Sequence, residues 1–481
     1  MSAITLLVHP QLHEPIFDFL STKQCAAVRC VSKALSRRII DCFVERVSEA
    51  LHFVRSPLLP YRMRTHTRIF AEVTDGPKHR APAISSSKLR CLMAAMPPIE
   101  FQTRVADQIR TLCVDRFSSS SRPVFQPLLE HLTKCEIGSS RGKPEDLVVL
   151  DLADCGADLT DSHLRALVPR CKSLAVFHVP PGKSLTASSV MAIVKAAGPS
   201  LRHVDFGKFR GSGVGDIVEA IAEFCPNVES LGVEGSQGFT DDLLACVLQR
   251  CRLKYCFIGH SATTDTGILH VIEKCDDLEY LSLSPHVRSP ESKPPPAICK
   301  RRLLKVKTLD FLFYGFRDPV GIPLLLRCFP NLENLIFRQP DFIDDILLAA
   351  VDACPGVSSL ALPRTDISVS VFPAMKRWNI RHVSLSVGRS VDNGTRSEGD
   401  VEEWPLGDLL AVIGAKLESL SLENDKLLSM DDCRVIALHC PCLELLISAA
   451  PLEPELKAIL KGGCPQLQCG CRMRKSKREK R

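Results

Sequence analysis

Cysteine and histidine are the residues of this sequence with the greatest capacity for chemistry, and 22 cysteines and 14 histidines stand among its 481 residues. The densest group of thiols is CPQLQCGCRMR, which holds Cys464, Cys469 and Cys471. Three thiolates suit zinc, but a structural zinc site needs four closely spaced ligands, and the next cysteines and histidines stand far upstream. The spacing therefore favours buried thiols over a metal site, and a metal-dependent hydrolase is the least favoured class of function.

Other short patterns typical of catalysis carry little weight in this sequence. The histidines form no H-E-x-x-H motif; HPQLH at 9–13 has the H-x-x-x-H spacing and GSSRG at 138–142 the G-x-S-x-G spacing, but each stands alone, without further motif residues of a metal site or hydrolase beside it. GKFRGSGVGD, from 207 to 216, has the glycines of a phosphate-binding loop but no acidic residue of the required context. We therefore expect a non-catalytic protein without a metal or cofactor.

Many of the cysteines instead mark a recurring frame. CPNVESLGVEG, from 225 to 235, returns as CDDLEYLSLSP, FPNLENLIFRQ, CPGVSSLALPR and CPCLELLISAA. Self-similarity at a fixed period indicates a repeat architecture. The gaps between the first apolar residues of successive L-x-x-L-x-L frames cluster near about 26 residues, with one longer gap between Ile380 and Leu417, and IRTLCV at 109–114 fits an earlier frame. These first apolar residues are Leu147, Leu174, Leu201, Val228, Leu253, Leu278, Val306, Leu332, Val357, Ile380, Leu417 and Leu443.

Each repeat divides into a strand-like piece and a helix-like piece. In SLGVEG, Leu231 and Val233 alternate with small or polar residues, as in a short strand. In FTDDLLACVLQRC, from 239 to 251, the apolar residues follow helical spacing, and a Thr or Asp stands where the helix should begin. LTDSHL, TTDTGI and FIDDIL repeat that start. One such unit cannot shield its own leucines, so the repeats must stack into a continuous core.

This pattern resembles the cysteine-containing subclass of leucine-rich repeats over residues 105–470. Cys171, Cys225, Cys275, Cys354 and Cys440 occupy the leading position of the frame, and Phe329 replaces cysteine in one repeat. We interpret these cysteines as small hydrophobic residues that close a helix against the next strand. The resemblance implies an α/β solenoid, an arc with parallel strands on the concave side and helices on the convex side. The proline-rich stretch 286–302 and the polar stretch 388–404 are expected to be convex-side loops.

The N-terminal stretch LLVHPQLHEPIFDFLSTKQCAAVRCVSKALSRRI, from 6 to 39, has helical spacing of its own. It resembles an F-box, a small helical adaptor, although Leu35 replaces the usual Trp, Lys23 replaces a common Asp and Pro15 lies within the expected first helix. The resemblance implies docking to a Skp-type adaptor of a cullin complex through Pro10, Leu12, Ile16, Phe17, Leu20, Val28 and Val31. The alternative is an N-terminal cap that covers the first repeat, as solenoids require.

These patterns divide the chain into an F-box-like module at 1–45, a connector at 46–104, twelve or thirteen repeats at 105–470 and a basic, disordered tail at 471–481. The tail's seven basic residues and one Glu account for the formal charge of +6. Because the body is neutral in sum, we expect no nucleic-acid partner. No apolar run is long enough to span a membrane, and MSAITLLVHP, which lacks a basic lead and has only a short apolar stretch, is not expected to be a signal peptide. A reducing compartment, the cytosol or nucleus, is expected.

The residues that flank the central apolar pair of each strand should point into the arc. Exposed Tyr, Phe and Arg there would be typical of a protein-binding hot spot. Function then divides into two classes: substrate recognition for a Skp–cullin–F-box ubiquitin ligase, or a scaffold without a ligase role, for example in a cytoskeletal or flagellar assembly. In either class an unidentified protein partner would contact the predicted concave face through His178, His203, Asp205, Glu234, Tyr255, Phe257, Tyr280, Asp310, Asn334, Ile336 and Arg338.

Overall fold

The structure is a computed structural model that describes most of the repeat region and one short strand before it. Within the described residues, no helix combines the length and apolar character needed to cross a lipid bilayer. The chain divides into two compact units, Met1–Val228 and Glu229–Arg481, which are described separately. The described residues are 51–53, 111–114, 146–152, 159–179, 185–207, 209, 212–236, 238–259, 261–283, 301–312, 321–338, 343–363, 367–386, 406–422, 428–448 and 452–471.

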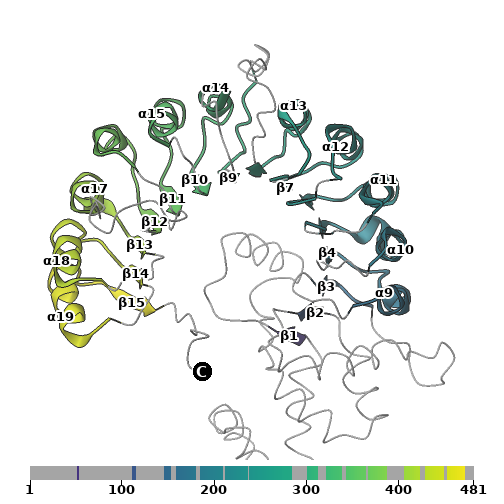
Figure 1. Cartoon of the computed structure of the whole chain (residues 1–481), viewed down its shortest axis with the longest axis horizontal. Coiled ribbons are helices and arrows are strands. Elements are labelled where there is room, and N and C mark those ends of the chain that lie inside the picture. The colour runs from purple at the N-terminus through teal and green to yellow at the C-terminus, as the bar shows by residue number, and fades with distance from the viewer. Residues whose placement is uncertain are drawn as a thin grey trace, which may run out of the picture. The chain divides into compact units, whose positions relative to one another are not determined.

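The first unit alternates short parallel strands with helices (Figure 1). Strand β1 comes from the connector, for which the sequence predicted no element, and β2 confirms the early frame at 109–114. Neighbouring strands pair in register, for example Val176 with His203. Its described elements are β1 Leu51–Phe53, β2 Thr111–Val114, β3 Val149–Asp151, α9 Asp161–Leu167, η4 Val168–Arg170, β4 Val176–His178, α10 Ala187–Ala197, η5 Gly198–Ser200, β5 His203–Asp205 and α11 Val214–Phe224.

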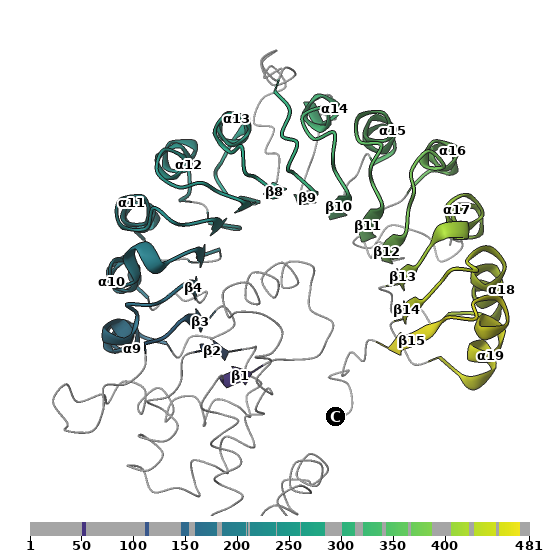
Figure 2. The same cartoon turned by 180° about the vertical axis from the view of Figure 1, so that it is seen from behind.

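The second unit continues the same alternation. Its strands line the inner side of a curve and its helices the outer side, in both views of the molecule (Figures 1 and 2). Its described elements are β6 Ser230–Gly232, α12 Asp241–Leu248, β7 Tyr255–Phe257, α13 Asp265–Lys274, β8 Tyr280–Leu283, β9 Thr308–Leu312, α14 Gly321–Leu326, β10 Asn334–Arg338, α15 Ile343–Ala353, β11 Ser359–Pro363, η7 Val369–Val371, α16 Phe372–Met375, β12 His382–Ser386, α17 Leu406–Ile413, η8 Gly414–Lys416, β13 Ser419–Leu422, α18 Met430–His439, β14 Leu445–Ser448, α19 Pro454–Gly463 and β15 Gln468–Cys471.

The repeat frame predicted from the sequence is confirmed. All twelve first apolar residues of the frames, from Leu147 to Leu443, are buried, and a strand begins shortly after each of them. Burying a large aliphatic side chain contributes about 1.5 to 3 kcal/mol, so each unit depends on contacts between successive repeats. Each unit is therefore a stretch of leucine-rich-repeat solenoid. Most of the loops expected at 286–302 and 388–404 lie outside the described residues.

The leading cysteines close each helix against the next strand, as the sequence predicted. Cys171, Cys225, Cys275, Cys354 and Cys440 are buried, and so is Phe329 in the equivalent place. Their thiols donate weak hydrogen bonds to carbonyl groups: Cys225 Sγ lies 3.5 Å from Val194 O, and Cys354 Sγ lies 3.4 Å from Phe329 O. A thiol is small enough for this space and, unlike an aliphatic side chain, can donate a further weak hydrogen bond to a carbonyl at the end of a helix.

The Thr and Asp residues at the helix starts hold neighbouring repeats together. Thr160, Thr240 and Thr264 are N-caps as predicted, whereas in FIDDIL the helix already begins at Ile343. The Asp that follows the cap accepts hydrogen bonds from the cap of the next helix. Asp241 Oδ1 accepts from the backbone N–H of Thr264 at 2.8 Å, and its other oxygen accepts from the Thr264 hydroxyl.

The same bridge recurs between two other pairs of repeats. Asp161 accepts from the N–H and hydroxyl of Thr186 at 2.8 and 2.7 Å, and Asp344 accepts from the N–H of Ser368 at 3.1 Å. Burial alone would raise the pKa of Asp161, but the hydrogen bonds from Thr186 and Ser189 outweigh it and lower that pKa. The bridge therefore contains a carboxylate at neutral pH.

Gly267 makes room for one of these bridges. A Cβ atom added to Gly267 would lie 2.4 Å from Asp241 Oδ1, closer than real Cβ atoms approach an oxygen. The glycine thus stands within α13 despite its poor helix propensity because the carboxylate of Asp241 crosses the helix at this point.

Removing the Asp241 bridge should destabilise the second unit. We expect Asp241→Ala to lower the free energy of unfolding by about 1 to 2 kcal/mol more than Asp242→Ala, because only Asp241 supplies charged acceptors to the next repeat. Asp242 is the matched control, since it is exposed and lies in the same first turn with the same relation to the helix dipole. Urea denaturation of the full chain measures the difference; equal losses for the two variants would contradict the role of the bridge.

Candidate protein-binding surface

The predicted adaptor-binding residues Pro10, Leu12, Ile16, Phe17, Leu20, Val28 and Val31 lie outside the described residues. Their role therefore stays a prediction from the sequence. The surface that the structure describes is the side of the strands that faces away from the helices.

Three predicted surface residues lie in the first unit. His178 ends β4 and is paired in register with Asp205 of β5, and His203 begins that strand. His178 Nδ1 lies 3.2 Å from Asp151 Oδ2, and Asp205 Oδ1 accepts from the N–H of Gly207 at 2.8 Å. The two histidines are buried and Asp205 is half-buried. These side chains share one face of the strands, as predicted, but little of either histidine is exposed.

The predicted exposure of the three aromatic residues in the second unit is wrong. Tyr255, Phe257 and Tyr280 are 6%, 1% and 3% exposed. They do lie together: the rings of Phe257 and Tyr280 have centroids 4.7 Å apart, and Tyr280 Oη donates to Asp310 Oδ2 at 2.9 Å. Strands spaced about 4.8 Å apart bring such large side chains into contact with their neighbours. Their exposed area is too small for the predicted hot spot.

The remaining predicted residues lie along the same face and differ in how deeply they are buried. Glu234 is half-buried in the turn after β6, and Asp310 on β9 is buried. On β10, Asn334 is half-buried and its Nδ2 donates to Thr308 Oγ1 at 3.1 Å, while Ile336 is buried. Arg338 ends β10, and its side chain lies outside the described part of the structure.

A row of alternating charges, missed in the sequence, runs along the start of the strands in the second unit. Each member directly follows the first apolar residue of its frame, and its backbone N–H donates to the carbonyl of the preceding member. Lys254 Nζ lies 3.0 Å from Glu229 Oε2, and Arg381 lies 3.2 Å from Glu418. This edge row consists of Glu229, Lys254, Glu279, Lys307, Glu333, Ser358, Arg381, Glu418 and Glu444.

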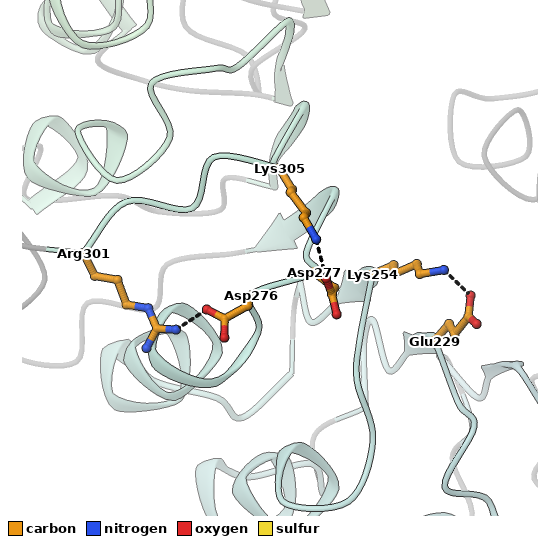
Figure 3. A network of polar contacts seen from close by, with 6 residues as sticks. All are labelled: Glu229, Lys254, Asp276, Asp277, Arg301 and Lys305. Carbon is orange, nitrogen blue, oxygen red and sulfur yellow. Dashed lines mark hydrogen bonds and ion pairs between the residues drawn. The ribbon is translucent and has the colours of Figure 1, made fainter.

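Further ion pairs join the turns beside the edge row. Figure 3 shows Arg301 with Asp276 and Lys305 with Asp277, next to the pair of Lys254 with Glu229. The hydrogen bond from Lys305 lowers the pKa of Asp277 and raises that of Lys305. Because opposite charges follow one another from repeat to repeat, most of this edge is neutralised within the protein itself.

Strands β11 to β14 present a different surface, which we call the serine face. Its side chains form two rows that cross the four strands, and registered pairing places the members of each row next to one another. The first row is Ser359, His382, Ser419 and Leu445; the second is Ala361, Ser384, Ser421 and Ile447. His382 is exposed, Leu445 is 36% exposed and the serines are half-buried, so this face is more open than the aromatic cluster.

The leading thiols lie in apolar surroundings that keep them protonated. Burial raises the pKa of Cys171, Cys275, Cys354 and Cys440 to about 12, so these thiols stay protonated. Cys464 Sγ donates to the carbonyl of Cys440 at 3.1 Å. No group of three or more His, Cys, Asp or Glu residues among those described could hold a metal ion.

The chain was compared with family models, curated proteins and solved structures. No family model matches the chain. The chain is similar to F-box/LRR-repeat protein 4 from Bos taurus, with 25% identity over 118 residues, which are 24% of this chain and 19% of that protein's length. The chain therefore spans less than two thirds of this relative.

Two solved structures are also similar to the chain. The first is the Rad7 and Elc1 complex in yeast, with a TM-score of 0.43, 15% identity and coverage of 88% of this chain and 97% of that chain. The second is the leucine-rich repeat-containing protein LegL7 from Legionella pneumophila, with a TM-score of 0.37, 15% identity and coverage of 58% and 85%.

Reversing one charge of the edge row should destabilise the second unit. Arg381→Glu places three carboxylates in succession, with Glu418 and Glu444, and we expect a loss of about 0.5 to 1 kcal/mol at low salt. The double variant Arg381→Glu with Glu418→Arg should recover most of that loss, because the opposite charges are restored in reverse order. Urea denaturation at two salt concentrations measures both. Lys457→Glu, an exposed site on α19, is the control, and an equal loss there would refute the row's contribution.

The thiols should differ sharply in reactivity. At pH 8 a thiol of pKa about 12 is ionised in only about one molecule in ten thousand, so Cys171 and Cys354 should resist iodoacetamide in the folded protein. Among the cysteines whose burial the structure describes, exposed Cys442 should be alkylated first, and urea should make all the thiols reactive. Peptide mass spectrometry measures the order of labelling. Rapid labelling of Cys354 without denaturant would contradict the burial described here.

Proposed function

We propose that this protein is a non-catalytic substrate-recognition subunit of a Skp–cullin–F-box type of ubiquitin ligase. The observation on which this depends is the combination of an F-box-like N-terminal sequence with cysteine-type leucine-rich repeats in one chain. The similarity to F-box/LRR-repeat protein 4 supports it, since that relative's name joins the same two features. In this proposal the N-terminal helices bind a Skp-type adaptor of the cullin complex, and the repeats hold a protein substrate in the cytosol or nucleus.

The repeat region is suited to holding a protein rather than to transforming it. The titratable residues of the edge row are largely paired with one another, and the leading thiols are buried and protonated. What the strands offer instead is a continuous face of registered side chains. Such a face supplies shape and hydrogen bonds for a partner, while the transferase would come from the rest of the complex.

The second candidate is a leucine-rich-repeat scaffold without a ligase role. Lys23, Leu35 and Pro15 depart from the F-box pattern, which favours a segment that only caps the first repeat. In that case the repeats would join proteins within a stable assembly, such as a cytoskeletal or flagellar structure.

Disrupting the F-box-like helix should release the adaptor. Replacement of Ile16, Phe17 and Leu20 by Glu removes the apolar side chains that the resemblance assigns to the adaptor contact, and we expect at least about a tenfold loss of the co-purified Skp-type subunit. Affinity purification followed by quantitative mass spectrometry measures the loss.

The matched control is Leu438→Glu. Leu438 lies on α18 and is 74% exposed, so this variant makes the same kind of aliphatic-to-Glu replacement, once instead of three times, without disturbing a buried contact. Adaptor recovery should match that of the parent chain. Undiminished adaptor binding by the triple variant would rule out the proposed docking, and recovery of a stoichiometric assembly without adaptor or cullin would favour the scaffold.

A further inference from the structure

We infer that the serine face binds an extended segment of a partner protein that carries a basic residue beside an aliphatic one. This inference rests on the proposed function, because it specifies the part of the substrate that the repeats would hold. It also moves the expected contact from the aromatic cluster of β7 and β8 to the face of strands β11 to β14.

The hydroxyl groups of the serine face are available to a ligand. Ser359, Ser384, Ser419 and Ser421 make no side-chain hydrogen bond among the described residues, and neither does the exposed imidazole of His382. By contrast, Tyr255 and Tyr280 donate to the carboxylates of Glu279 and Asp310. A polar partner can thus pair with the serine face without breaking bonds within the protein.

Because the serine hydroxyls are unpaired, the serine face suits a partner in the form of an extended peptide segment better than a partner in the form of a folded domain. An extended segment brings one N–H and one carbonyl per residue that must be satisfied when they are buried, whereas a folded domain has already paired its own. A serine hydroxyl both donates and accepts, so it can serve either group. Small side chains also let a backbone approach closely. The four strands span about 14 Å, which a segment of four to five residues at about 3.3 Å per residue would cross.

The β14 end of the face specifies the side chains of the segment. Glu444 is exposed and its carboxylate has no partner among the described residues, because its neighbour in the edge row, Glu418, pairs with Arg381. Leu445 lies next to it and is 36% exposed. An aliphatic side chain of the partner can cover Leu445 while an adjacent Lys or Arg pairs with Glu444, which is the charge complementarity that the inference uses.

Nucleic acid fits this face poorly. The four strands present no Phe, Tyr or Trp side chain for base stacking, and the cation at their edge, Arg381, is already paired with Glu418. The adjacent carboxylate of Glu444 would repel phosphate. The chemistry of the serine face therefore points to a polypeptide.

A phage-displayed library of random heptapeptides, sorted against the full chain, tests this inference. We expect enrichment of peptides with Lys or Arg beside Leu, Ile or Val. Glu444→Lys should reverse the preference, with the ratio of basic to acidic clones falling by about tenfold, because attraction becomes repulsion. Glu455→Lys is the matched control, since it makes the same charge change at an exposed site on α19, and it should leave the ratio unchanged.

The hydroxyl groups have a test of their own. The double variant Ser384→Ala with Ser421→Ala should lower the affinity for an enriched synthetic peptide by about tenfold, because two hydrogen bonds to the peptide are removed. Ala361 of β11 already stands in the same row, next to Ser384, so alanine should be tolerated there and the fold should be retained. Thermal denaturation of the double variant checks this. Ser188→Ala on α10, an exposed serine, is the control.

Several results would overturn the inference. One is the absence of any enriched motif, and another is an enrichment that both sets of variants leave unchanged. A third is peptide binding that appears only after residues 472–481 are deleted, because the chain's own basic tail would then be the occupant of the serine face. Adaptor co-purification by the same variants separates the two proposals. If it is retained while peptide binding fails, the serine face alone is refuted; if it is lost from the parent chain as well, the ligase role fails.

Discussion

The stacking of one repeat on the next is the interaction on which the rest of each unit depends. Within a repeat, a strand of three to five residues and one short helix leave their apolar side chains open on both flanks. Only the neighbouring repeats cover them, so a buried residue such as Leu278 is a property of the array rather than of its own repeat. Every specialised feature of the chain must therefore be compatible with that periodic contact.

Polar groups reinforce the stacking at three levels across the solenoid. On the helix side, the carboxylate of Asp241 reaches the cap of the next helix, and Gly267 leaves room for it. Between the layers, the Cys354 thiol donates to carbonyls of the preceding repeat. At the start of the strands, charges alternate along the edge row. Each contribution is small, but each recurs, and all of them act between repeats rather than within one.

Much of this fold follows from the sequence because periodicity determines which side of a strand a residue occupies. The frame predicted the buried positions, the strands and the role of the leading cysteines correctly. The frame could not predict how deeply each side chain on that side is buried. Tyr255, Phe257 and Ser384 all lie on the same side of their strands, yet the aromatic rings bury one another while the serine remains half-buried beside small neighbours. The Asp bridges were missed for a similar reason, since an N-cap motif explains an Asp at a helix start without reference to the next repeat.

The end of the charge alternation bears directly on recognition. Where Glu and Lys alternate, from Glu229 to Glu333, each charge has an opposite neighbour and the edge offers a charged ligand little net attraction. At Glu418 and Glu444 two carboxylates follow one another with a single cation, Arg381, to balance them. This break coincides with the strands of the serine face, whose serine hydroxyls make no hydrogen bond among the described residues. Selectivity for a basic, extended segment can therefore arise from an interruption of the same row that stabilises the rest of the second unit.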